Sequence, residues 1–167
     1  MKIFLIAAIT LDGFIAREAG QSSFDWTSPE DRTFFIKKTK EAGVVIMGKT
    51  TYQTIGKPLK DRLNIIYTSK PLKSNYDNLV YTNQKPQALL SDFKKQGYKK
   101  IAICGGASIY SLFMKSGLVD HMYLTVEPHL FGQGVKLFND QLDCKLKLLS
   151  SKKLNERGTM LLEYRVI

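Results

Sequence analysis

The sequence predicts an α/β fold of three layers, in which a mainly parallel central sheet of about eight strands carries helices on both faces. Short apolar runs rich in β-branched residues alternate with helical patterns over the first two thirds of the chain, and this alternation is typical of parallel strands joined by helical crossovers. Two of these runs end in glycine immediately before a helix. The last two strand-like segments follow each other without a helix, which predicts a C-terminal antiparallel hairpin at a sheet edge.

The length and composition predict one domain, residues 1–167, that is large enough to bury a core. The apolar run at residues 3–9 is too short to cross a bilayer, and Asp12 follows it where a secretory signal would place small residues. The two cysteines, Cys104 and Cys144, do not suggest a disulfide framework. These features predict a cytoplasmic protein that does not enter a membrane.

The net charge of +10 has three explanations, which are attraction of nucleic acid, attraction of a small polyanion such as a phosphorylated cofactor, and solubility alone. The lysines are spread along the chain, and no stripe of alternating basic and aromatic residues occurs. This distribution disfavours nucleic acid as a partner and leaves the other two explanations open.

The order of the elements follows from hydrophobic periodicity and turn residues. Strands are predicted at residues 3–9, 44–47, 63–68, 79–81, 100–104, 121–126, 146–151 and 159–166, and helices at residues 29–40, 50–55, 86–96 and 107–115. Residues 10–28 lack periodicity and are interpreted as a long loop, either a functional lid or a plain surface excursion. The closing hairpin is either an exposed edge or a dimer contact, so the protein is either a monomer or a homodimer.

The chain is organised around the segment VVIMGKTTYQTIG, residues 44–56. A buried strand at residues 44–47 is followed by Gly48 and leads into a short helix predicted at residues 50–55. Several backbone N–H groups are therefore unpaired and attract an anion, to which Lys49 adds a positive charge. The segment ICGGAS, residues 103–108, repeats this pattern with Gly105 and Gly106. Each segment is either an ordinary strand–helix turn or a phosphate site, and two of them in one chain favour a dinucleotide.

Asp31 is a candidate functional carboxylate near the start of the first predicted helix. Ser28 is a good N-cap and Pro29 a good first residue, so Asp31 could complete a capping box. However, Phe34 and Phe35 lie three and four residues further on and share its face of the helix. A carboxylate on an apolar face is costly without a partner, so Asp31 is either a cap or a group held ready for a ligand.

Other polar residues follow the next strands. Arg62 is either a solvated strand flank or a clamp for a ligand carboxylate, and Thr68 and Ser69 follow a strand at the edge where α/β sheets bind ligands. His121 and His129 are the only histidines, and the sequence predicts neither a metal site nor a nucleophile–base set. One inward carboxylate beside a dinucleotide site suits hydride transfer, in which the cofactor supplies the chemistry.

Together these residues resemble the dihydrofolate reductase family over most of residues 2–126. The matching parts are IMGKTTYQTIGKPLKDRLNIIYTS at residues 46–69, the helix with Trp26, Pro29, Asp31, Phe35 and Thr39, the ICGGASIY loop at residues 103–110, and the strand Tyr123-Leu124-Thr125. The resemblance implies the family's fold, NADPH as the cofactor, and the reduction of 7,8-dihydrofolate to tetrahydrofolate.

Carried over residue by residue, the resemblance implies that Asp31 is the catalytic residue, which binds the 2-amino and N3 edge of the pterin with support from Thr125 and promotes protonation at N5. The implied folate pocket consists of Ile6, Ala7, Phe35, Ile55 and Leu59, with Arg62 on the glutamate carboxylate. The nicotinamide would pass Ala8, Ile15 and Ala16. The phosphates and adenosine would be held by Gly48, Lys49, Thr50, Thr51, Thr68, Ser69, Cys104, Gly105, Gly106, Ala107, Ser108, Ile109 and Tyr110. Lys49, near the adenosine 2′-phosphate, would favour NADPH over NADH, and the family's cis peptide would fall between the paired glycines.

The sequence also departs from that family. Arg32 stands where the family usually has an apolar pocket residue, and the loop at residues 12–25 looks longer than in small bacterial members. The segments at residues 11–16 and 128–138 look more like the related riboflavin-biosynthesis reductase domain, which uses NADPH to reduce a phosphoribosylamino-pyrimidine. In that alternative Arg32 would face a sugar phosphate. It ranks second, because that group does not usually combine the Asp31 helix with the Arg62 segment, and a non-enzymatic basic nucleic-acid-binding module ranks third.

Overall fold

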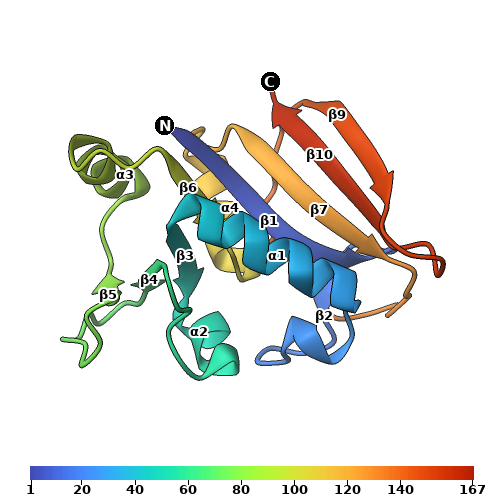
Figure 1. The fold of residues 1–167 in the computed structure, drawn as a ribbon, viewed down its shortest axis with the longest axis horizontal. Helices are drawn as coiled ribbons and strands as arrows, with labels where there is room; N and C mark the ends of the chain where they lie inside the picture. Colours follow the sequence, from blue (N-terminus) through green and yellow to red (C-terminus); the bar gives the residue numbers. More distant parts are fainter.

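A central sheet of eight strands runs through the molecule (Figure 1), as seen in a computed structural model that describes residues 1–167. Its strands are β1 (Lys2–Thr10), β3 (Val44–Gly48), β4 (Leu63–Tyr67), β5 (Leu79–Thr82), β6 (Lys100–Ile103), β7 (His121–Glu127), β9 (Leu146–Lys153) and β10 (Met160–Val166). The strand order is β5-β4-β3-β6-β1-β7-β10-β9. All neighbours are parallel except β10, which runs antiparallel to both β7 and β9.

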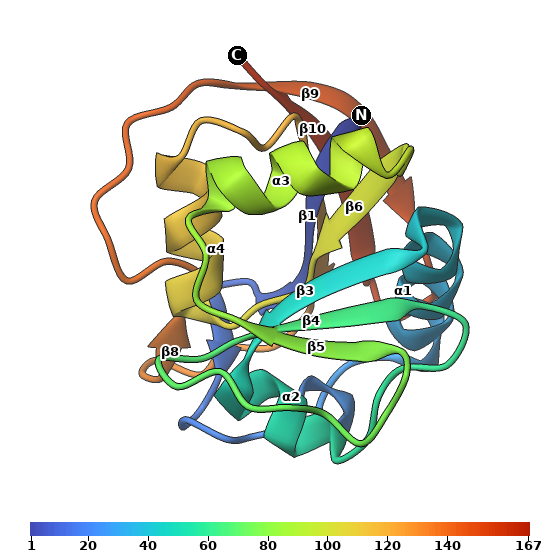
Figure 2. The same cartoon turned by 90° about the vertical axis from the view of Figure 1, so that its left-hand side faces the viewer.

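Helices cover both faces of this sheet, as Figure 2 shows from the side. One face carries α1 (Pro29–Ala42) and α2 (Lys49–Ile55), and the other carries α3 (Pro86–Lys95) and α4 (Ala107–Lys115). The three layers, the parallel sheet and the C-terminal hairpin are those that the sequence predicted. None of the helices has the length and apolar character needed to cross a bilayer.

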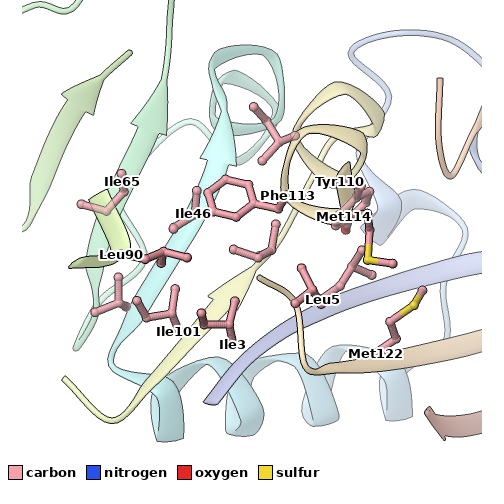
Figure 3. Close-up of a cluster of buried hydrophobic side chains, with 14 of the residues drawn as sticks. Ile3, Leu5, Ile46, Ile65, Leu90, Ile101, Tyr110, Phe113, Met114 and Met122 are labelled. Carbon is pink, nitrogen blue, oxygen red and sulfur yellow. The ribbon is translucent and has the colours of Figure 1, made fainter. Parts of the chain in front are cut away.

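Two apolar cores follow from the alternation of side chains along the strands. Ile3 and Leu5 of β1 point towards α3 and α4, where they join a cluster that includes Phe113 (Figure 3). Phe4 and Ile6, one position along, join the cluster on the α1 side. Because β1 is buried on both faces, its sequence is an almost continuous apolar run, as is typical of parallel sheets.

The prediction for residues 10–28 is corrected in part. This segment contains a short strand, β2 (Phe14–Ala16), and a 3₁₀ helix, η1 (Ser23–Asp25). The strand pairs with β8 (Val135–Lys136) in a separate antiparallel sheet. A three-residue strand has no detectable period, and its partner lies more than a hundred residues away, so local pattern could not reveal it.

The hydrogen bonds at the start of α1 show whether the Asp31 side chain completes a capping box. The Ser28 side chain accepts a hydrogen bond from the backbone N–H of Asp31 at 3.2 Å, and Pro29 takes the first helical position. The backbone N–H of Ser28, which a capping box would satisfy with the Asp31 carboxylate, instead donates to Glu127 at 2.8 Å. The Asp31 side chain is therefore not used as a cap.

Candidate active site

A cavity of about 820 Å³ opens at the carboxyl ends of β3, β4 and β6 and along the middle of β1. Open parallel sheets bind their ligands at this edge, and the volume is that of a site for a small molecule or cofactor. Most of the predicted site residues border it, namely Ile6, Ala7, Ala8, Ile15, Ala16, Asp31, Phe35, Gly48, Lys49, Thr50, Thr51, Ile55, Thr68, Ser69 and residues 104–110. The fold thus brings together segments from the first and the second half of the chain.

Asp31 lies in the wall of this cavity with only 6% of its surface exposed. Burial raises the pKa of its carboxyl to about 6, because the ionised form loses solvation. The hydroxyl groups of Thr125 and Thr27 and the charge of Arg32 act in the opposite direction, and the charge of Glu127 acts in the same direction as burial. A carboxyl with this pKa can bind a ligand as an anion and also exchange a proton near neutral pH.

Two residues of β7, Thr125 and Glu127, lie next to the Asp31 carboxyl on the side away from the cavity. Both are almost fully buried, at 1% and 2% exposure. Neither borders the cavity, so the Asp31 carboxyl lies between Thr125 and the cavity. Glu127 was missed by the sequence interpretation, although the sequence held a signal for it. In HMYLTVE it lies two residues after Thr125, which places both side chains on the same face of the strand.

The wall beside Asp31 is aromatic and apolar. Phe35 and Ile55 border the cavity there, and so does Phe24 of η1, which the sequence interpretation did not include. The Phe24 ring meets Phe35 edge to face, with 6.3 Å between the ring centroids. The Arg32 guanidinium lies over the Phe24 ring, 4.7 Å from its centroid, and donates a hydrogen bond to the Phe24 carbonyl at 3.1 Å. Arg32 therefore holds Phe24 and does not itself border the cavity.

Two predicted pocket residues, Leu59 and Arg62, lie outside the cavity wall. The Arg62 side chain is packed inward at 7% exposure. Its Nη1 donates to the Thr39 hydroxyl at 2.7 Å, and its Nε donates to the Lys60 carbonyl at 2.8 Å. These bonds fix the guanidinium and leave the second N–H of Nη1 and both N–H groups of Nη2 as its remaining donors.

The two glycine turns lie against each other. The backbone N–H of Gly48 donates to the carbonyl of Gly105 at 2.8 Å, and the peptide between Gly105 and Gly106 is cis. A Cβ on Gly48 would lie 3.2 Å from Ile109, and one on Gly106 would lie 3.2 Å from Thr51. Side chains at these positions would therefore crowd the contact between the two turns.

Both glycines are also helix N-caps without a side chain. Gly48 precedes α2 and Gly106 precedes α4, and neither helix has a side-chain cap for its first N–H groups. The free N–H groups of two helices thus face one cavity, to which Lys49 adds a positive charge. Thr68 and Ser69 supply hydroxyl donors at the end of β4. This combination suits a ligand with several phosphate groups.

Two further groups in the wall are fixed by burial. The Tyr110 hydroxyl donates to the carbonyl of Ile6 at 2.7 Å, and burial raises its pKa well above the ordinary value. Burial likewise raises the pKa of the Cys104 thiol to about 12, so it stays protonated and unreactive at neutral pH. Both side chains therefore shape the cavity without supplying acid–base chemistry.

The fold and the cavity define a three-layer α/β protein in which a buried carboxyl, Asp31, and two glycine turns border one cavity. The chain belongs to the dihydrofolate reductase family, because the family model described as dihydrofolate reductase matches residues 2–158. The dihydrofolate reductase of Bacillus subtilis is 32% identical over 135 residues, which cover 80% of this chain and 73% of that protein. The uncharacterized protein YwjB of the same organism is 28% identical over 164 residues, or 93% of each chain.

Solved structures show the same fold. A putative riboflavin biosynthesis protein from Shewanella sp. PV-4 is similar with a TM-score of 0.85 and 20% identity, over 100% of this chain and 99% of that one. Dihydrofolate reductase from Enterococcus faecalis, solved with NADP(H), is similar with a TM-score of 0.75 and 22% identity, over 99% of this chain and 94% of that one. The resemblance seen in the sequence, including its riboflavin-type features, is confirmed at the level of family and fold.

Proposed function

We propose that the protein is an NADPH-dependent oxidoreductase of the cytoplasm that reduces 7,8-dihydrofolate to tetrahydrofolate. The observation that carries this proposal is the position of Asp31. It is a buried carboxyl with a pKa of about 6 that borders the same cavity as both glycine turns. A residue 31 in solvent, or on the other face of the sheet from the glycine turns, would have been incompatible with this function.

Asp31 would bind the 2-amino group and N3 of the pterin through its two carboxylate oxygens. Thr125 faces the carboxylate and supports its orientation. The reaction adds a hydride to C6 and a proton to N5 of the substrate, and Asp31 promotes the protonation, through a water molecule. Phe35, Phe24 and Ile55 line the adjoining wall, where they would exclude bulk water from the ring.

NADPH bound across the glycine turns would supply the hydride. The residues present fit its phosphate groups, because two uncapped helix N-termini and Lys49 face the cavity. Ala8, Ile15 and Ala16 would lie along the nicotinamide. Arg62, held by Thr39, does not border the cavity, so the glutamate carboxylate of the substrate would have to extend past the cavity wall to reach its free N–H groups.

The test is the oxidation of NADPH that depends on added dihydrofolate, followed by absorbance. Asp31→Asn keeps the shape of the side chain but neither ionises nor transfers a proton, so turnover is expected to be lost while NADPH still binds. Asp92→Asn on α3, at a partly exposed position outside the cavity, is the matched control and should keep full activity. Full activity in Asp31→Asn would overturn the proposal.

A riboflavin-type reductase of a phosphoribosylamino-pyrimidine is the second candidate, favoured by the segments at residues 11–16 and 128–138. These segments lie together, since β2 pairs with β8 and Asp12 accepts hydrogen bonds from the N–H groups of Phe131 and Gly132. Their likeness therefore concerns the cavity wall formed by β2 and β8 and not the helix that carries Asp31. NADPH binding without dihydrofolate turnover would favour this candidate. A failure to bind NADPH, with salt-sensitive binding of DNA or RNA, would leave only the basic nucleic-acid-binding module.

A further inference from the structure

Glu127, the last residue of β7, is a buried carboxylate that the proposed reaction does not use. It is 2% exposed and takes part in no ion pair. Burying a carboxylate without a cation costs free energy unless hydrogen bonds compensate for the lost solvation.

The hydrogen bonds of Glu127 connect two elements that are distant in sequence. Its Oε1 accepts from the backbone N–H of Ser28 at 2.8 Å, and its Oε2 accepts from the hydroxyl of Thr159 at 2.7 Å. Ser28 is the N-cap of α1, and Thr159 ends the turn between β9 and β10. Both contacts have Glu127 as the acceptor, which suits the ionised carboxylate. Glu127 therefore fixes the first turn of α1 against the hairpin.

That first turn carries Asp31, and the charge of Glu127 also reaches it. The groups that face the Asp31 carboxyl are Glu127 from β7, Arg32 from its own helix and the Tyr110 phenol from α4, together with neutral hydroxyls. The Arg32 guanidinium is turned towards Phe24. Glu127 is thus the negative charge that opposes the ionisation of Asp31.

We propose that Glu127 is a positioning residue for Asp31, which orients the helix turn that carries Asp31 and places a fixed negative charge behind its carboxyl group. Burial is the main cause that keeps Asp31 partly protonated near neutral pH, where a proton is needed for the substrate, and the charge of Glu127 acts in the same direction. The effect on rate rests on the proposed reduction of dihydrofolate, whereas the effect on Asp31 itself does not.

Glu127→Gln removes the charge and keeps the size and the acceptor for Ser28. The titration midpoint of Asp31 is measured in the free protein by NMR with labelled aspartate. We expect the midpoint to move down from about 6 while staying above the ordinary value of 3.8, because the carboxyl remains buried. Glu30→Gln is the matched control, because Glu30 is an exposed glutamate in the same helix turn that also contacts the hairpin, through Asn155. It should leave the midpoint unchanged.

Thr159→Val separates the charge from the hydrogen bond. It removes the donor to Glu127 and retains the carboxylate, so the Asp31 midpoint should stay near its wild-type value. An equal shift in Thr159→Val and Glu127→Gln would show a structural role only and would overturn the proposal. So would an unchanged midpoint in Glu127→Gln, or its failure to fold, because glutamine keeps the acceptor for Ser28 and loses only the charge inferred to act on Asp31.

The pH profile of dihydrofolate reduction gives the second measurement. In Glu127→Gln, the pH above which kcat/KM falls should shift downwards, while the KM for NADPH stays the same. If the protein does not turn over dihydrofolate, the proposed function fails but the NMR titration still decides the role of Glu127. An active enzyme whose pH profile does not move would contradict the inference about Glu127 alone.

Discussion

The buried Asp31 carboxyl makes the free energy of unfolding depend on pH. Its pKa is about 6 in the folded state against an ordinary value of 3.8, so the folded protein binds this proton more tightly than the unfolded chain does. The resulting contribution to stability is complete below about pH 4 and is lost as the pH rises through 6. Above that pH, the folded state has to hold a buried and ionised carboxylate.

Asp31→Asn should therefore be more stable than the wild type at pH 8, by about 2–3 kcal/mol. The gain should largely disappear at pH 4, where the wild-type carboxyl is protonated in the folded state. Urea unfolding at both pH values measures the difference, and Asp92→Asn should show no comparable gain. A gain of equal size at pH 4 and pH 8 would show that burial does not set the titration of Asp31.

The burial of a single side chain was predictable from the sequence where its spacing from apolar neighbours placed it on a buried face of its helix or strand. The spacing of Asp31 from Phe34 and Phe35 indicated an inward carboxylate, and the structure gives it 6% exposure. Glu127 was also within reach, through its offset of two from Thr125. Its partners were not, because one is a backbone N–H and the other is Thr159 in a different element. A sequence pattern can indicate a buried acid, but it does not show what binds it.

At the scale of elements, η1 is held over the cavity by contacts from α1. Arg32 donates to the Phe24 carbonyl and lies over its ring, and Phe24 packs edge-on against Phe35. The sequence interpretation instead considered a ligand phosphate for Arg32. The hydrogen bond and the ring contact explain why a charged residue is tolerated where the family usually has an apolar one, since the planar guanidinium fits both.

Arg32→Lys should loosen this contact, because an ammonium keeps the charge but cannot both lie flat on the ring and reach the carbonyl. An exposed cation–π contact contributes about 0.5–1 kcal/mol, so we expect the KM for dihydrofolate to rise roughly two- to fivefold with the KM for NADPH unchanged. Steady-state kinetics with each substrate varied in turn measure both values.

Arg17→Lys, next to β2, provides the control, because Arg17 also makes a cation–π contact. Arg17 lies over Phe131, 4.0 Å from the ring centroid, and does not border the cavity. Its KM for dihydrofolate should stay at the wild-type value. Equal effects of the two substitutions would mean that the loss of either arginine–aromatic contact, rather than the position of Phe24, changes substrate binding.

At the scale of the whole molecule, the sheet order assembles the site. Strands β3 and β6 are neighbours, so the glycine turns that follow them lie together. The next strands in the sheet are β1, which borders the cavity, and β7, which carries Thr125. Periodicity predicted the main strands and their mostly parallel direction, but not this order, because apolar runs that are buried on both faces do not specify their neighbours. The resemblance to a known family supplied the arrangement that local pattern lacked.

The net charge of +10 predicts that ionic strength controls cofactor binding. A positive protein attracts the phosphate groups of NADPH at long range, so the association rate measured by stopped flow should fall as salt is added, and more steeply for NADPH than for NADH.

Lys49→Gln should weaken NADPH binding roughly three- to tenfold and leave NADH binding nearly unchanged, since Lys49 would contact only the additional phosphate. Lys94→Gln is the matched control, because Lys94 is exposed on α3 outside the cavity. This substitution removes the same charge and should weaken the binding of both cofactors equally and slightly. Equal losses for NADPH and NADH in Lys49→Gln would show that Lys49 contributes only to the general field and does not select the cofactor.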